Sequence, residues 1–174
     1  MEKLSDLVEI FRVESHKIVK DRNTGGICYL LAHCLNEYLL ELGYKSRKVT
    51  GNQALLKKGK RTRYVTYGTF EPDNFNSIGH YHTWCEIDIN DITYIIDTSL
   101  AYNKSFLRRQ GISLSKNIPN SLFSNFKSTY YYKYLEDKSL NHLSEETLAE
   151  IPEEFIRNII AKTLQRARQY SLSL

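Results

Sequence analysis

Three residues of this 174-residue chain, Cys28, His82 and Asp97, are of the types that together activate a thiol for nucleophilic attack. A cysteine attacks as its thiolate, so it needs a neighbouring base to take its proton near neutral pH. A histidine can be that base, and an acidic acceptor beside it fixes the useful tautomer and favours the imidazolium. The residue types therefore suggest cysteine-based catalysis, provided that the fold brings three distant positions together.

Cys28 stands at the predicted start of a helix, which favours a reactive role. It follows Thr24-Gly25-Gly26-Ile27, and the apolar spacing over residues 30–42 predicts a helix that ends at Gly43. The first turn of a helix presents unpaired N–H groups and the positive end of the dipole, which stabilise a thiolate or an oxyanion. The glycines ahead of Cys28 let the backbone pass close to a substrate.

His82 and Asp97 lie on two segments that predict a β-hairpin. Residues 80–89 and 92–98 are rich in β-branched and aromatic side chains, and Asn90-Asp91 between them suits a two-residue turn. Across such a hairpin His82 comes close to Asp97, so that the base and its acceptor lie side by side. The prediction depends on the register, because a shift by one residue turns every side chain to the other face.

Around these residues the sequence resembles the transglutaminase-like superfamily, whose members share a papain-like Cys-His-Asp arrangement. The resemblance covers roughly residues 24–100 and is carried by Gly26-Ile27-Cys28-Tyr29, His82-Thr83-Trp84-Cys85-Glu86 and Tyr94-Ile95-Ile96-Asp97-Thr98. It implies that Cys28 is the nucleophile, that His82 is the general base, and that Asp97 orients the base.

The resemblance also implies what surrounds the three residues. No Gln occupies the usual papain-like position, so Asn23 or backbone N–H groups alone would hold the oxyanion. The residues predicted to line the substrate site are Gly26, Tyr29 and Trp84. The chain is much shorter than the arylamine N-acetyltransferases of this superfamily, so we expect no CoA-dependent acetyl transfer and no cofactor.

The elements that must position these residues predict an α+β, papain-like fold. N-terminal helices at 3–20 and 28–42 would pack on a central antiparallel sheet built from 46–55, 62–70, 80–89 and 92–98. Beyond Asp97 we expect a short helix at 103–109, irregular chain at 111–121, a strand at 130–134, and helices beginning near Ser144 and Pro152. We expect a single domain over residues 1–174, with a catalytic core of about 20–100 and a helical extension of about 103–174.

Composition indicates a reduced, non-membrane protein. The net charge is +4, the three cysteines are an odd number for a disulfide framework, and no apolar run suits a signal peptide or a membrane span. We therefore expect a cytoplasmic location, or export by a route that uses no signal peptide, and no membrane partner.

Two structural alternatives concern the cysteines and histidines. Cys34 and Cys85 fit the buried core better than a reactive site, because Cys34 lies within an apolar helix and Cys85 faces away from His82. A zinc site could use His80, His82 and Cys85 with Cys28 or Cys34, but zinc motifs use tighter paired spacings and strand alternation separates Cys85 from His82. We expect no metal.

A basic segment, Lys57-Lys58-Gly59-Lys60-Arg61, suggests a third alternative. Such a run is more typical of a solvated hairpin tip than of a nucleic-acid site. A protein or peptide substrate is therefore the favoured partner over nucleic acid, and the oligomeric state is left open.

The favoured function is acyl chemistry on an amide bond through a thioester intermediate. Hydrolysis by a peptidase or deamidase needs no second binding site and is preferred. The alternatives are transamidation by a transglutaminase, another acyl transfer, or a non-catalytic binding domain of the same fold.

Overall fold

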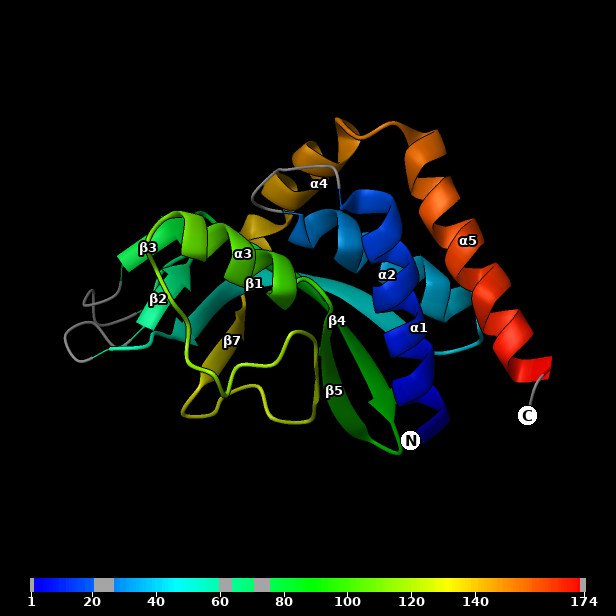
Figure 1. Ribbon diagram of the computed structural model, residues 1–174, viewed down its shortest axis with the longest axis horizontal. Helices are drawn as coiled ribbons and strands as arrows, with labels where there is room; N and C mark the ends of the chain where they lie inside the picture. Colours follow the sequence, from blue (N-terminus) through cyan, green and yellow to red (C-terminus); the bar gives the residue numbers. More distant parts are fainter. Residues whose placement is uncertain (1, 21–26, 60–63, 71–75, 173–174) are drawn as a thin grey trace.

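The computed structural model describes residues 2–20, 27–59, 64–70 and 76–172, which form a seven-stranded sheet with helices on both faces (Figure 1). In chain order the elements are α1 (Glu2–Val19), α2 (Cys28–Glu41), β1 (Ser46–Leu56), β2 (Tyr64–Tyr67), β3 (Asn76–Gly79), β4 (His82–Ile89), β5 (Ile92–Asp97), α3 (Leu100–Arg109), β6 (Leu122–Ser124), β7 (Tyr132–Glu136), a 3-10 turn η1 (Lys138–Leu140), α4 (Asn141–Ala149) and α5 (Glu153–Leu172). The α+β class is confirmed. No helix of the described ranges is both long and apolar enough to cross a membrane.

The sheet is mixed, whereas the sequence predicted an antiparallel one. Its strand order is β3-β2-β1-β4-β5-β6, with β7 also paired to β1. The pairs are antiparallel apart from β2 and β3, which run parallel. Strand β3 was not predicted because its residues, Asn-Ser-Ile-Gly, carry no alternating apolar pattern.

Two apolar cores lie on opposite faces of the sheet. Cys85, Ile87 and Ile96 belong to the core that α1, α2 and α5 share. Trp84 and Ile95 belong to the other core, together with residues of α3 and β7. Because side chains alternate along a strand, β4 and β5 contribute to both cores. The catalytic candidates thus come from elements fixed by burial on each side.

The hairpin between β4 and β5 has the predicted turn. Asn90 and Asp91 adopt positive φ values of 49° and 62°, which a tight two-residue turn requires and which Asn and Asp tolerate. The strands pair from Ile89↔Ile92 to Cys85↔Ile96. One further step in this register sets Asp97 opposite Trp84, on the same face as His82.

Gly51 permits a close approach that shapes the site. It pairs with His82 on one side and with Glu136 of β7 on the other. A Cβ at this position would lie 2.1 Å from the carbonyl oxygen of Leu135, which no side chain could tolerate. The glycine therefore lets β7 pack against β1 where β1 meets the start of β4.

The C-terminal third differs from the predicted helical extension. It contains β6 and β7, which pair with β5 and β1 of the central sheet. The short helix α3 begins at Leu100, and α4 begins at Asn141 rather than near Ser144. Helix α5 begins directly after Pro152, as predicted.

Candidate active site

Cys28, His82 and Asp97 each occupy the end of an element. Cys28 is the first residue of α2, His82 the first of β4 and Asp97 the last of β5. All three residues are buried: Cys28 is 4% exposed, Asp97 2% and His82 0%. Cys28 and Asp97 also line one internal gap beneath α2, which is too narrow to hold a water molecule.

The imidazole of His82 is bonded to the carboxylate of Asp97. Their Nε2 and Oδ2 atoms lie 2.8 Å apart, with both side chains shielded from solvent. A carboxylate acceptor on Nε2 requires that nitrogen to carry a proton, so Nδ1 is the nitrogen that can exchange a proton with a substrate or a thiol.

Asp97 accepts four further hydrogen bonds, which keep it ionised although it is buried. Its Oδ2 accepts from the hydroxyl of Tyr134 at 2.7 Å and from Nε2 of Gln53 at 3.1 Å. Its Oδ1 accepts from the backbone N–H and the hydroxyl of Ser99 at 2.9 and 2.7 Å. Burial alone would raise the pKa of Asp97, but the charge of His82 and these donors outweigh burial and lower it.

His82 lies close enough to Cys28 for a thiolate there to affect the pKa of His82. Burial alone would lower the pKa of His82, but the Asp97 carboxylate and a thiolate at Cys28 outweigh it and raise that pKa to about 10. Nδ1 of His82 makes no strict hydrogen bond to any described residue. Among the described groups, Nδ1 is therefore the ring nitrogen left for a proton from Cys28.

Aromatic rings hold the imidazole in place. The ring of Trp84 stacks with that of His82 at 6.3 Å and 15°, and the rings of Tyr67 and Tyr134 lie 5.6 and 6.0 Å from it. Trp84 is only 1% exposed and its ring packs against that of His82 within the core, so its contact with substrate stays a prediction. Its indole N–H donates to Glu86 at 3.2 Å, which fixes the ring.

Glu86 is a buried carboxylate that accepts a hydrogen bond from Trp84 and pairs with two cations at the surface. It is paired with Arg47 and with Lys127, each at 2.6 Å. Paired and hydrogen-bonded in this way, its charge is compensated inside the protein. Its contact with the indole of Trp84 gives Glu86 a supporting role for that ring.

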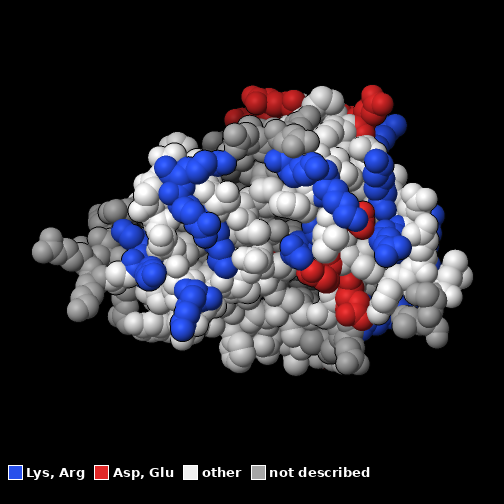
Figure 2. Space-filling model, viewed as in Figure 1, with Lys and Arg blue, Asp and Glu red and all other residues white. Residues whose placement is uncertain are grey.

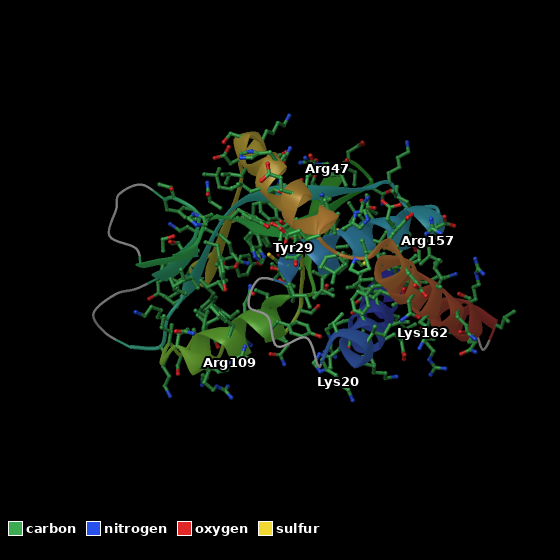
Figure 3. All side chains as sticks on the ribbon, turned by 90° about the horizontal axis from the view of Figure 1, so that it is seen from above. Lys20, Tyr29, Arg47, Arg109, Arg157 and Lys162 are labelled. Carbon is green, nitrogen blue, oxygen red and sulfur yellow. The ribbon has the colours of Figure 1, made fainter. Side chains whose placement is uncertain are left out.

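The other residues predicted for the substrate site have different outcomes. Tyr29 is partly buried where the start of α2 meets α4 (Figure 3). Burial is the main cause that raises the pKa of Tyr81, and a negative charge on Tyr29 raises it further. Asn23 and Gly26 lie outside the described residues.

The other two cysteines are core residues, as predicted. Burial raises the pKa of Cys34 to about 12 and that of Cys85 well above its usual range. The thiol of Cys85 donates to the carbonyl of Ala32 at 3.0 Å, beneath α2 and on the face opposite His82. The residues considered for zinc therefore do not converge, and the described ranges contain no cluster of three or more possible metal ligands.

Four supporting residues were missed from the sequence. Gln53, Ser99 and Tyr134 surround Asp97, and the hydroxyl of Tyr67 is buried with no hydrogen-bond partner among the described residues. Only Ser99 had a local signal, because an Asp followed two residues later by Ser favours a side-chain to backbone turn. Tyr134 and Gln53 approach Asp97 through strand pairings that no short motif reveals.

Comparisons with known proteins bear on the fold alone. No family model matches the chain, and no curated protein matches it. A crystal structure described only as a genomics target superposes with a TM-score of 0.58 at 11% identity, over 92% of this chain and 78% of the other. The likeness supports the α+β arrangement and carries no information on chemistry.

Proposed function

We propose that this protein is a papain-like cysteine enzyme of the transglutaminase-like type, which cleaves an amide bond through a thioester intermediate. The observation that carries the proposal is the buried His82, bonded through Nε2 to Asp97 and with Nδ1 left for Cys28 at the start of α2. A general base held in this tautomer beside a cysteine is what nucleophilic thiol catalysis needs.

In the proposed reaction His82 carries the proton of the Cys28 thiol to the departing amine. The thiol proton moves to Nδ1 of His82 before the thiolate of Cys28 attacks the carbonyl carbon of an amide. The imidazolium then returns this proton to the departing nitrogen as the C–N bond breaks, which releases an amine and leaves a thioester on Cys28. Water, deprotonated by His82, attacks the thioester to give a carboxylic acid and the free thiol.

Tyr67 is the best-placed side chain to help hold the oxyanion. Its ring lies 5.6 Å from that of His82, and its buried hydroxyl has no partner among the described residues. Burial, and then the charge of a thiolate at Cys28, raise the pKa of Tyr67, so its hydroxyl stays protonated as a donor. The backbone N–H of Cys28 would supply a second donor.

We expect Tyr67→Phe to lower kcat by about 10²-fold and to leave KM nearly unchanged, because an oxyanion donor acts only in the transition state. Tyr64→Phe is the matched control, since that hydroxyl donates to the carbonyl of Tyr130 away from His82. Steady-state kinetics on one amide substrate measure both. A loss of equal size in the two variants would remove Tyr67 from the reaction.

Hydrolysis is favoured over transamidation because the site is closed. With Cys28 only 4% exposed and His82 fully buried, water reaches the thioester more easily than a second macromolecule bearing an amine. A non-catalytic binding domain would not require a tautomer-fixed histidine beside a cysteine, so it ranks below both.

The direct test is to trap the thioester. The full chain is incubated with a pool of glutamine- and asparagine-containing peptides, quenched in acid and analysed by intact mass and peptide mapping. We expect an acyl adduct on Cys28 that Cys28→Ala abolishes and Cys34→Ala retains. A new free carboxylate at the attacked carbonyl indicates hydrolysis, whereas incorporation of added methylamine at that carbonyl indicates transamidation; ammonia or the amine fragment is released in both cases. If no cysteine carries an adduct, and both the glutamine- and the asparagine-containing peptides stay intact, a non-catalytic binding domain would be favoured.

A further inference from the structure

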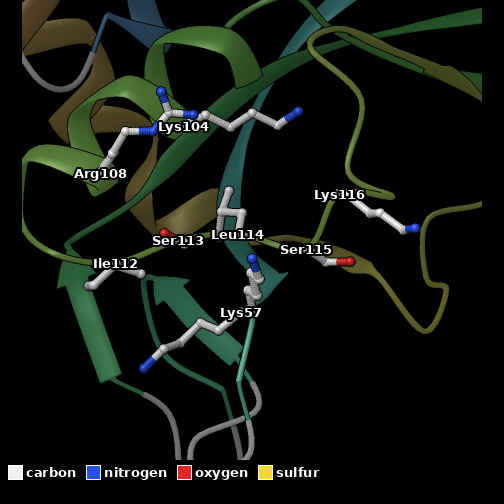
Figure 4. Close-up of a pocket in the computed structure, with 9 residues that line it drawn as sticks. Lys57, Lys104, Arg108, Ile112, Ser113, Leu114, Ser115 and Lys116 are labelled. Carbon is white, nitrogen blue, oxygen red and sulfur yellow. The ribbon is translucent and has the colours of Figure 1, made fainter.

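A basic cavity of about 540 Å³ lies away from Cys28, between the end of β1, α3 and residues 112–116. It is lined by five cationic side chains, Lys57, Lys58, Lys104, Arg108 and Lys116, and by two serines. Lys104 and Arg108 on α3 lie on one side, Lys57 lies on the opposite side, and Ser113 to Ser115 lie between them (Figure 4).

The walls of this cavity are held by backbone hydrogen bonds. The N–H of Lys58 donates to the carbonyl of Ser113 and that of Ser115 to the carbonyl of Leu56, both at 2.8 Å. Directly before this segment Gly111 takes a φ of 75°, which turns the chain back against α3. The cations therefore project from fixed backbone on two sides, and the cavity is a formed feature of the fold.

Among the residues that the structure describes, the charge in the cavity is uncompensated. No described carboxylate lines it, and none of its five cations forms an ion pair with another described residue. Lys104 donates to neutral acceptors, the carbonyl of Ile118 and, at 3.0 Å, the side chain of Asn120. Burial, and then the charge of Arg108, lower the pKa of Lys104.

Figure 2 shows Lys and Arg side chains gathered over the part of this face where α3 lies, with the acidic side chains of the face lying elsewhere. Like charges held together repel one another, and an anion that binds among them removes that repulsion.

We propose that this cavity binds a small molecule that carries two or more phosphate groups. Its volume falls in the range of small-ligand pockets, about 300–1,000 Å³. Ammonium groups on opposite walls suit a compact polyanion, and serine hydroxyls can donate to phosphate oxygens. A nucleic acid would instead bind along an extended basic groove that follows its phosphate backbone. The test must therefore distinguish binding of nucleic acid from binding of a small polyphosphate.

Calorimetric titration of the full chain with sodium tripolyphosphate tests the proposal, with sulfate at matched ionic strength as the comparison anion. We expect saturable binding of tripolyphosphate and much weaker binding of sulfate. The double variant Lys57→Gln/Arg108→Gln is expected to weaken tripolyphosphate binding by about tenfold or more, because two charge-assisted contacts are lost.

The control is Lys162→Gln/Arg168→Gln, which removes the same charges from the exposed face of α5. It should change the affinity by less than about twofold, because salt screens the interaction between the ligand and charges that lie far from the site. Circular dichroism confirms that both variants are folded, and Cys28→Ala should bind as well as the wild type. Equal weakening in the two double variants would overturn the proposal. So would binding of a labelled single-stranded RNA that the cavity variant loses and tripolyphosphate does not displace.

Discussion

Replacing His82 by Ala is expected to lower amide turnover by about 10⁴-fold, because the variant has no base to take the thiol proton. His80→Ala is the matched control, since His80 is exposed and lies two residues away. It should change turnover by less than about threefold. The turnover rates of the wild type and of both variants on one amide substrate, measured at equal concentrations of folded protein, test this difference.

The same pair of variants separates thiol activation from substrate binding. At pH 6 an ordinary thiol is almost wholly protonated, so His82→Ala should slow alkylation of Cys28 by iodoacetamide by about 10²-fold. Peptide mapping assigns the modified cysteine, and the small reagent also reports whether Cys28, at 4% exposed, can be reached. Equal rates in the wild type and His82→Ala would remove His82 as the base.

Asp97→Asn is expected to lower turnover by about 10⁴-fold, because His82 would lose the acceptor that fixes its tautomer and stabilises the imidazolium. The structure also leads to an expectation for the stability of this variant. Asp97 accepts five hydrogen bonds in the interior, from His82, Tyr134, Gln53 and two groups of Ser99. An amide offers one acceptor oxygen and presents an NH₂ group to donors on its other side.

Asp97→Asn should therefore also reduce the free energy of unfolding by about 3 kcal/mol, since buried donors lose their partner. Urea unfolding followed by circular dichroism measures this loss. Gln53→Ala is the comparison, because it removes one neutral donor from Asp97 and keeps the His82 contact; we expect a smaller loss of turnover, about tenfold or less. Wild-type turnover in Asp97→Asn would remove Asp97 from the reaction.

The parts of the fold predicted correctly carry their signal in neighbouring residues. Asn90-Asp91 between two alternating segments specifies both a tight turn and a register, and that register brings Asp97 to the side of His82. The helix that starts at Cys28 follows from apolar spacing and a terminal glycine. These local rules were enough to bring two of the three candidate residues together.

The parts that were missed depend on contacts between distant segments. Tyr134 bonds to Asp97 only because β7 pairs with β1, and that pairing needs the bare backbone of Gly51. A glycine in a strand signals a close approach but does not say which segment approaches. Trp84 shares a strand face with His82, but its burial depends on how β7 and α3 close over that face.

The pH dependence of the central pair follows from the direction of two pKa shifts. His82 has a pKa raised to about 10, so its imidazole stays protonated and can pair with a thiolate at neutral pH. The pair is lost as the pH rises through that value. Asp97 has a pKa lowered below its ordinary value of 3.8, so its carboxylate stays ionised from below that pH through neutral pH.

The most direct test is to titrate the imidazole of His82 by NMR, in the full chain labelled with ¹⁵N, with the His82→Ala spectrum providing the assignment. We predict that both ring nitrogens stay protonated through neutral pH and that the transition falls at about pH 10. A transition near the ordinary histidine value of about 6.5 would mean that no thiolate–imidazolium pair forms between Cys28 and His82.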